Sequence, residues 1–307
     1  MRTCYPAVVA IELRTIERAE LEPARQLLIG ACCFDDIGPV AEETLFGRAP
    51  GALRSRVTAA FHGKTMVGVT ATGGRWLRVL AVDPTMRERG IGTALLAAAE
   101  SAVVDAGHAT LGVLAQPGNY LAPGIDARNT DAIAWLLRHD YEQAGSNTNL
   151  LIDVRENPKV SEARAAELAE RARAAGYRIE RAAAADAAAV AAAIEAEFSA
   201  AWAFEAERAL QSSGLHVARS ENGSLAAFAA HDGNNAGLGW FGPAGTWPEH
   251  RGKGLGGALL MACLVDVAPA HRFCTIAWIG PREFYDRVAG IASERRFTVM
   301  RKSLTEH

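Results

Sequence analysis

The spacing of apolar and polar residues changes period repeatedly along the chain, and these changes predict an alternation of strands and helices. In the first half, short apolar runs at 10–16, 75–82, 109–115 and 146–154 predict strands, and "RVTAAFHGKTMVGVTATGG" predicts a hairpin that turns at His62-Gly63-Lys64. Helix-forming residues with apolar positions on one face predict helices over 21–30, 93–107 and 131–140.

The second half repeats this order of elements. Its expected elements are a strand at 177–182, one or two alanine-rich helices within 182–210, a hairpin turning at Glu221-Asn222-Gly223, a strand at 236–245, a helix at 254–267, a strand at 273–280, a helix at 282–289 and a strand at 295–304. A chain of 307 residues is long enough for about two domains. We therefore expect one domain over 1–154, a linker with a solvated helix over 155–173, and a second domain over 174–307.

One glycine-rich motif occurs in both halves. "RERGIGTALL" begins at Arg87, and "RGKGLGGALL" begins at Arg251, so the copies lie 164 positions apart. In each half the motif stands between a predicted strand and a predicted helix. The first N–H groups of a helix have no partners within the helix and carry partial positive charge, and glycines let an anion approach them closely. The motif therefore predicts a phosphate or pyrophosphate ligand.

Two familiar phosphate motifs fit this pattern poorly. A Walker loop needs Ser or Thr after Gly-Lys, whereas Gly252-Lys253 is followed by Gly254. "GKGLGG" matches the GxGxxG dinucleotide fingerprint, but "GIGTAL" lacks the third glycine, and no acidic residue follows the second copy at the usual interval. Both copies instead share RxxGxG, preceded by a proline in "VDPTMRERGIG" and "TWPEHRGKGLG".

This shared form, with a hairpin before it and β–helix–β after it, resembles the GCN5-related N-acetyltransferase (GNAT) family. "LAVDPTMRERGIGTALL" fits the acetyl-coenzyme A motif of that family closely, and "AGTWPEHRGKGLGGALL" departs from it at Thr246-Trp247. The resemblance covers nearly the whole chain. It implies an α/β fold of two tandem GNAT modules, each a mixed, mainly antiparallel sheet flanked by helices.

The resemblance also implies which residues bind acetyl-coenzyme A. The strand before the motif would splay from its neighbour, and its backbone would pair with the pantetheine arm at Leu80 and Val82, with Ala244 and Thr246 as counterparts. The pyrophosphate would lie over the two motifs, at Arg87, Arg89, Gly90, Ile91, Gly92 and Thr93 in the first half and at Arg251, Gly252, Lys253, Gly254, Leu255, Gly256 and Gly257 in the second.

Acetyl transfer to an amine needs a neutral amine, a polarised carbonyl and an acid that protonates the departing thiolate. The resemblance assigns that acid to Tyr285 in "EFYDRVAG", whereas Leu136 stands at the matching place in the first half. The first half would then bind cofactor or act as a scaffold. Tyr285 could instead be a packing aromatic beside Phe284. The general base is open among Glu249, Glu205, Glu207 and a water relay.

The acceptor is the least determined part of the function. A long loop, "AQPGNYLAPGIDARNT", offers Tyr120 and Asp126, and Trp278 stands at the matching place in the second half. These phrases resemble a tandem subgroup with glucosamine-type substrates, whereas mycothiol synthase is matched poorly. We expect N-acetylation of a small primary amine, with an amino sugar as the leading candidate. The alternatives are a protein or peptide amine acetyltransferase and a non-catalytic acetyl-coenzyme A-binding module.

Composition narrows the setting. The net charge of −3 provides no basic field for nucleic acid or anionic lipid, so we expect neither as a partner. The first residues form neither a continuous apolar signal core nor a membrane span. Five cysteines, Cys4 included, show no metal-ligand spacing, which favours reduced thiols, no bound metal and a cytoplasmic protein. We expect a monomer with an internal pseudo-dimer, or a homodimer.

Overall fold

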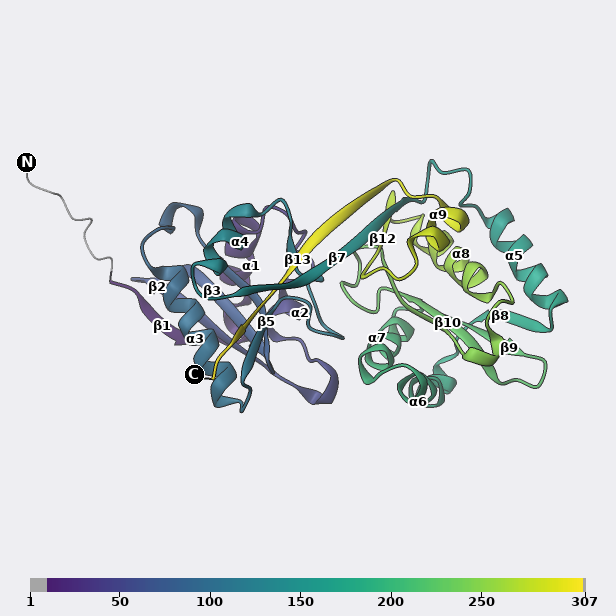
Figure 1. Ribbon diagram of the computed structural model, residues 1–307, viewed down its shortest axis with the longest axis horizontal. Helices are drawn as coiled ribbons and strands as arrows, with labels where there is room; N and C mark the ends of the chain where they lie inside the picture. The colour runs from purple at the N-terminus through teal and green to yellow at the C-terminus, as the bar shows by residue number, and fades with distance from the viewer. Residues whose placement is uncertain (1–9, 306–307) are drawn as a thin grey trace, which may run out of the picture.

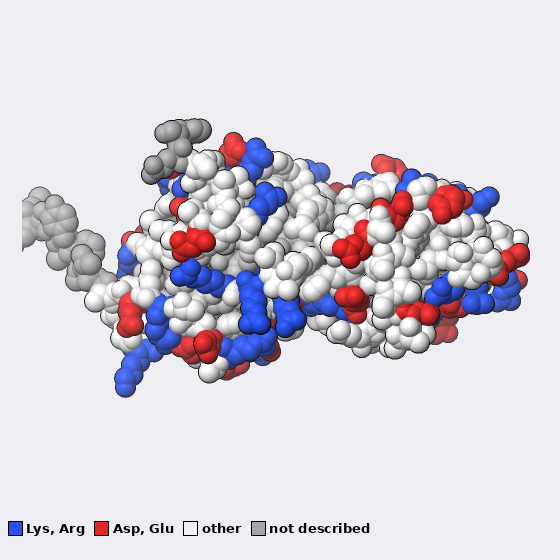
Figure 2. Space-filling model, turned by 90° about the horizontal axis from the view of Figure 1, so that it is seen from below, with Lys and Arg blue, Asp and Glu red and all other residues white. Residues whose placement is uncertain are grey.

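The protein consists of two lobes joined by two long strands (Figure 1). The computed structural model describes residues 10–305, so Cys4 lies outside the described residues. No helix in that range is both long enough and apolar enough to cross a bilayer. On the face shown in Figure 2, basic and acidic side chains occur on both lobes, in keeping with the small net charge.

The first lobe follows the order of elements that the sequence predicts and adds the short helix α2 and the short strand β6, which the sequence does not predict. Its strands are β1 (Glu12–Thr15), β2 (Ser55–His62), β3 (Thr65–Gly73), β4 (Trp76–Val82), β5 (Thr110–Val113) and the short β6 (Ile125–Asp126). Its helices are α1 (Leu21–Ala31), α2 (Ala41–Phe46), α3 (Ile91–Asp105) and α4 (Thr130–Leu137). The hairpin predicted at His62-Gly63-Lys64 is confirmed, because β2 and β3 pair as antiparallel neighbours on either side of it.

The second lobe repeats this arrangement. Its strands are β8 (Tyr177–Arg181), β9 (Leu215–Ser220), β10 (Leu225–His231), β11 (Trp240–Thr246) and β12 (Phe273–Ile276). Its helices are α5 (Glu162–Ala174), α6 (Ala187–Glu197), α7 (Ala200–Gln211), α8 (Leu255–Val267) and α9 (Arg282–Ala289). The connecting strands are β7 (Glu142–Asp153) and β13 (Ser293–Ser303).

All strands belong to one continuous mixed sheet that passes through both lobes. The order is β1-β2-β3-β4-β5-β13-β7-β12-β11-β10-β9-β8, with β6 beside β13. Among the described strands the parallel pairs are β4 with β5 and β11 with β12, and the other pairs are antiparallel. Helices flank the sheet in each lobe (Figure 1), so the predicted fold class is confirmed.

The two halves of the chain exchange their closing strands. The end of β7 pairs with β12 from Leu150 to Asp153, and the end of β13 pairs with β5 from Arg301 to Ser303. Side-chain burial agrees with this register: Leu150 is fully buried in the core of the second lobe, and Met300 in the core of the first. The expected division at residue 154 therefore needs correction, because each half completes the sheet of the other.

The expected linker over 155–173 is also partly a structural element of the second lobe. Most of it forms α5, which packs on α8 through the buried Ala172. Ser161 caps this helix, accepting a hydrogen bond from the N–H of Arg164 at 3.1 Å. The remaining faces of α5 are largely exposed, as the alternating charges of its sequence indicate.

An ion cluster fastens β13 to the first lobe. Arg295 contacts Asp126 at 2.8 Å and Asp35 at 3.2 Å, and it also donates to the backbone oxygen of Phe34. Arg128 binds both oxygens of Asp126, at 2.8 and 2.7 Å. Burial opposes ionisation of Asp126, but the hydrogen bonds from the two arginines outweigh it and hold the pKa of that carboxyl well below its usual range.

Replacing Arg295 with alanine should destabilise the protein, because it leaves Asp126 buried beside one cation instead of two. Arg128 still pairs with Asp126, so the loss is that of hydrogen bonds to a charged group, which typically contribute about 1.5–3 kcal/mol each. Urea unfolding measures this difference. Arg301→Ala is the matched control on the same strand, because its pair with Glu142 is exposed, and such pairs contribute about 0–1 kcal/mol.

The difference between wild type and Arg295→Ala should also depend on pH. The pKa of Asp126 is lower in the folded chain than in the unfolded one, so its contribution is complete above the unfolded value of about 3.9. It should then diminish as the pH falls through the folded pKa. Equal effects of the two substitutions at neutral pH would show that the cluster does not hold the exchanged strand.

Candidate functional site

The two RxxGxG motifs adopt the same backbone path in both lobes. We call residues 87–93 the first nest and residues 251–257 the second nest. Gly90 and Gly254, directly before α3 and α8, both have φ of 79° in the left-handed region. Two positions earlier, Glu88 has φ of 61° and its counterpart Gly252 has 75°. A non-glycine residue in this conformation costs about 1–2 kcal/mol, so the first nest keeps the path despite lacking a glycine at Glu88.

Each nest leaves unpaired donors and open space. The first helical hydrogen bonds run from Ala94 to the oxygen of Gly90 and from Ala258 to the oxygen of Gly254. The N–H groups before them therefore have no helical acceptor, as expected at the start of a helix. A Cβ atom built on Gly90 or Gly254 would meet nothing within 4 Å. The predicted nest residues thus offer their backbone N–H groups to an anion: Ile91, Gly92 and Thr93, and Leu255, Gly256 and Gly257.

The four basic residues of the nests divide into two kinds. Nε of Arg87 lies 3.4 Å from the oxygen of Val82, and Nε of Arg251 lies 3.2 Å from the oxygen of Thr246. Each of these arginines links the nest to the end of the preceding strand. All four residues are exposed, but Arg89 and Lys253 form no hydrogen bond or ion pair with another described residue, so they are the cations placed to approach a phosphate.

Beside the first nest, β4 and β5 separate after a short parallel pairing. They pair at Trp76 and Leu77, and the last bond runs from the N–H of Leu114 to the oxygen of Leu77 at 2.7 Å. β4 then continues without β5 beside it. Asp83 donates its N–H to β3, so by strand alternation the backbone groups of Leu80 and Val82 face the open side.

The second lobe contains the same gap. β11 pairs with β12 at Trp240 and Phe241, and beyond them the two strands separate. The N–H of Trp247 donates to β10 at 3.0 Å, so the backbone groups of Ala244 and Thr246 face the open side. Both pairs of strand residues named from the sequence therefore face a gap.

Two helices at the nests identify corresponding residues in the lobes. A Cβ on Gly92 would lie 3.3 Å from the Trp135 ring, and one on Gly256 would lie 3.5 Å from the Phe284 ring. Trp135 of α4 and Phe284 of α9 are thus counterparts, and the residues after them are Leu136 and Tyr285. Leu136 is buried in the core of the first lobe and carries no proton donor.

Tyr285 is both a packing aromatic and a free proton donor. Its ring centroid lies 5.1 Å from that of Phe284 and 6.4 Å from that of Phe241. Burial raises the pKa of the Tyr285 hydroxyl above its usual value, which keeps it protonated at neutral pH. No described residue forms a hydrogen bond with this hydroxyl, so it remains available to a ligand.

An aromatic cluster of Tyr120, Trp240 and Trp278 lies where the two lobes meet. The Tyr120 centroid is 6.1 Å from that of Trp240 and 5.4 Å from that of Trp278. The carbonyl of Tyr120 accepts from Nδ2 of Asn234 at 2.8 Å, which anchors the long loop of the first half to the second lobe. Trp240 and Phe241 are consecutive in β11, so their side chains point to opposite faces of the sheet. The aromatic cluster and Tyr285 therefore flank the gap from opposite faces.

No protein-family model and no curated protein sequence matches the chain. Several solved structures, in contrast, align with the chain over most of its length. A GCN5-related glucosamine N-acetyltransferase region of a fungal multi-domain GH3 β-N-acetylglucosaminidase aligns with a TM-score of 0.75 and 16% identity, over 96% of this chain and 38% of that one. A tandem GNAT protein from the clavulanic acid biosynthesis pathway aligns with a TM-score of 0.67 and 18% identity, over 97% of this chain and 100% of that one.

A GCN5-related N-acetyltransferase from Sphaerobacter thermophilus gives a TM-score of 0.64 at 18% identity, covering 96% of both chains. The chain has the tandem GNAT fold. The order of elements in the two lobes is that of this fold, as the sequence resemblance implies. The chain spans 38% of the length of the fungal protein, so the likeness there concerns one region of a larger molecule.

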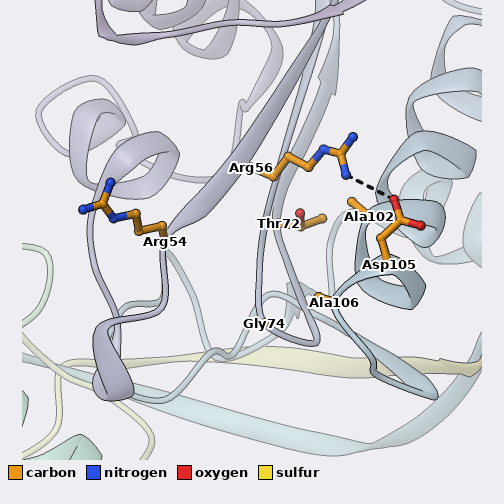
Figure 3. A pocket seen from close by; sticks show the side chains of 7 residues that line it. All are labelled: Arg54, Arg56, Thr72, Gly74, Ala102, Asp105 and Ala106. Carbon is orange, nitrogen blue, oxygen red and sulfur yellow. Dashed lines mark hydrogen bonds and ion pairs between the residues drawn. The ribbon is translucent and has the colours of Figure 1, made fainter.

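Two surface hollows lie away from the first and second nests. One, of about 270 Å³, lies between the start of β2 and the end of α3, where Arg56 pairs with Asp105 at 3.2 Å (Figure 3). The other, of about 370 Å³, lies along β5 and β13 and includes Trp76 and Arg301. Neither hollow includes a residue that the sequence assigns to the cofactor or the acceptor.

Of the acceptor residues named from the sequence, Tyr120 and Trp278 are brought together and Asp126 is not placed with them. Both oxygens of Asp126 are engaged by Arg128 and Arg295, which accounts for the residue structurally. We therefore do not retain Asp126 as an acceptor ligand.

The three carboxylates considered as bases differ in environment. Glu249 and Glu207 are exposed. Glu205 of α7 is 5% exposed, and burial raises its pKa to about 7 against the opposing hydrogen bond from the N–H of Gly118. The oxygen of Glu205 lies 3.1 Å from that N–H, in the loop that carries Tyr120. A carboxylate with a pKa of about 7, as Glu205 has, suits a base near neutral pH.

Asn149 of β7 is a site candidate that the sequence did not indicate. Its Oδ1 accepts the N–H of Trp278 at 2.9 Å, at the point where the chain leaves β12. The side chain is fully buried, and its Nδ2 has no partner among the described residues. Asn149 belongs to the first half of the chain and reaches this position through the exchanged strand. No local pattern in the sequence marks it.

Proposed function

We propose that the protein is an acetyl-coenzyme A-dependent N-acetyltransferase whose reaction takes place in the second module. The observation that carries this proposal is the arrangement around β11. The second nest, the open backbone of Ala244 and Thr246, and the free hydroxyl of Tyr285 adjoin the same strand gap. The tandem GNAT fold supports acyl transfer in general, and the second nest offers an anion N–H groups that have no helical acceptor.

The residues of the second module would divide the work of transfer. Acetyl-coenzyme A supplies an activated acetyl group when bound. The N–H groups of the second nest would bind its pyrophosphate, because helix N-termini favour anions, with Lys253 adding charge. The edge of β11 would orient the pantetheine arm at Ala244 and Thr246.

The proton donor and the proton acceptor of the proposed reaction lie on opposite faces of the gap. The neutral amine would attack the acetyl carbon from the face of the aromatic cluster, and the C–S bond would break. Tyr285 would give its proton to the departing sulfur from the other face. The proton lost by the amine would pass to Glu205, directly or through water, since a carboxylate with a pKa of about 7 accepts protons near neutral pH.

The first module has a different proposed role. It retains a nest and a strand gap, but Leu136 stands where the second module has Tyr285. We propose that it binds cofactor or serves as a scaffold without chemistry of its own. The first module contributes Tyr120 and Asn149 to the proposed site of the second module. This contribution would explain why the chain retains the first module.

A small amine, with an amino sugar as the leading candidate, is the proposed acceptor. Trp278 supports it, because this ring of the aromatic cluster is 39% exposed and aromatic faces pack well against the apolar face of a sugar ring. The glucosamine N-acetyltransferase named among the similar structures is in keeping with this choice. The net charge of −3 favours neither nucleic acid nor an anionic membrane as a partner. The alternative is an acetyltransferase that acts on protein or peptide amines.

Replacing Tyr285 with phenylalanine should lower turnover by about 10²–10⁴-fold, the usual cost of losing a general acid. The ring and its packing remain, so folding and cofactor affinity should persist. A thiol-release assay under conditions where chemistry limits the rate measures the loss. Tyr141→Phe is the matched control, because that hydroxyl bonds Glu100 in the first lobe. Full activity of Tyr285→Phe would remove Tyr285 from the mechanism.

Free glucosamine should be acetylated with a higher kcat/KM than lysine peptides. Trp278→Ala should raise the KM for the sugar more than it lowers kcat, because the substitution removes a binding face and leaves Tyr285 in place. Trp202→Ala is a suitable control, since that tryptophan packs on Phe198. If peptides are the better substrates, the amino-sugar assignment is wrong while acetyl transfer itself stands.

A further inference from the structure

A cluster of two histidines and one aspartate lies at the far end of the second lobe from its nest. His216 stands at the start of β9, His231 ends β10, and Asp266 lies in the last turn of α8. Nε2 of His216 and Nε2 of His231 are 2.7 and 3.4 Å from Oδ2 of Asp266. Both histidines are 7% exposed.

The fold, rather than chance contact, aims these side chains at one point. His216 pairs with Ala229 across the β9–β10 ladder, so His231 is its diagonal neighbour on the same face. That face packs against α8, which presents Asp266. One ligand atom from each of the three residues lies within 4.8 Å of the others.

Hydrogen bonds around the cluster fix the orientation of the His231 ring. Nδ1 of His231 lies 3.0 Å from Oδ2 of Asp232, and a carboxylate can only accept, so Nδ1 donates there. The other oxygen of Asp232 accepts the N–H of Gly237 at 3.0 Å. Metal-bound histidines characteristically donate their second ring nitrogen to a carboxylate in this way.

We propose that His216, His231 and Asp266 form a binding site for a divalent transition metal, with zinc as the best match. Two imidazole nitrogens and one carboxylate oxygen are a common zinc ligand set. Tetrahedral ligands at about 2.0–2.1 Å from zinc lie about 3.3 Å apart. The Asp266 oxygen lies at this distance from His231 (3.4 Å) and closer to His216 (2.7 Å), so a bound ion would move the His216 and Asp266 side chains slightly apart. The Asp266 side chain is 22% exposed, which leaves a path for the ion and room for a fourth ligand.

One neighbouring cation opposes the metal. Nη2 of Arg181 lies 2.7 Å from Oδ2 of Asp266, the same oxygen that the histidines approach. The Arg181 side chain is 44% exposed at the end of β8, so it can turn into solvent when a metal enters. Arg181 and the metal therefore compete for one carboxylate oxygen.

The site would act on structure rather than on the acetyl-transfer chemistry. It would join β9, β10 and the last turn of α8, whose first turn forms the second nest. A ligand that binds only the folded chain stabilises it in proportion to its concentration above Kd. The metal would thus fix the far end of the helix that carries the cofactor nest.

The test uses the full chain without a histidine tag, stripped with a chelator and titrated with Co²⁺ while visible absorption is recorded. Wild type should bind one Co²⁺ per chain with the absorption of a four-coordinate ion, and Zn²⁺ should displace it and raise Tm. His216→Gln and Asp266→Asn should weaken binding at least tenfold, whereas His250→Gln should bind as wild type does.

Arg181→Ala separates a metal site from a purely structural cluster. If a metal competes with the guanidinium, this substitution should tighten Co²⁺ binding several-fold, even though it removes an ion pair. Circular dichroism establishes that each variant is folded. Absence of Co²⁺ binding by wild type, or equal binding by wild type and His216→Gln, would overturn the proposal and leave the cluster as a hydrogen-bonded ion network.

Discussion

The exchange of β7 and β13 is the constraint on which the rest of the structure depends. β5 pairs with β4 at Trp76 and Leu77, and β12 pairs with β11 at Trp240 and Phe241, before each pair of strands separates. Such short pairings leave most backbone groups of β5 and β12 in need of other partners. β13 supplies them to β5, and β7 supplies them to β12. Each gap can open because the strand on its far side, β5 or β12, is hydrogen-bonded to a strand from the other half.

This dependence gives the first half a reason to persist beside the second half, in which we propose that the reaction takes place. Its β7 carries Asn149 to the end of β12, and its long loop carries Tyr120 to the tryptophans of β11 and of the turn after β12. Across the interface, Glu43 of α2 pairs with Arg208 of α7 at 2.6 Å. The proposed acceptor surface is therefore built from both halves, and loss of the first would remove part of it.

The sequence predicts the local parts of this structure well, because local chemistry determines them. Glycines at Gly90 and Gly254, the strand before each and the helix after each are encoded within a few neighbouring residues. The same holds for the counterpart relation of Leu136 and Tyr285, which the packing of Trp135 and Phe284 on the nests confirms. Repetition of the motif reveals the tandem GNAT fold without any long-range information.

What the sequence does not predict depends on contacts between distant segments. A closing strand has the same alternation of apolar and polar residues whether it completes the sheet of its own half or that of the other half. The exchange of β7 and β13 therefore has no local signature in the sequence. Asp126 looks like a free polar loop residue until Arg295 is placed beside it. The cluster of His216, His231 and Asp266 joins three elements with no motif spacing, so no local pattern brings these side chains together.

Calorimetric titration of acetyl-coenzyme A, paired with the rate of thiol release, tests the central claim most directly: the second nest holds the reacting cofactor. Gly90→Val and Gly254→Val are matched substitutions, because both residues have φ of 79° and open space around them. Gly254→Val should abolish turnover and remove one binding event, while Gly90→Val should leave turnover intact. Turnover that survives Gly254→Val and disappears in Gly90→Val would contradict the account.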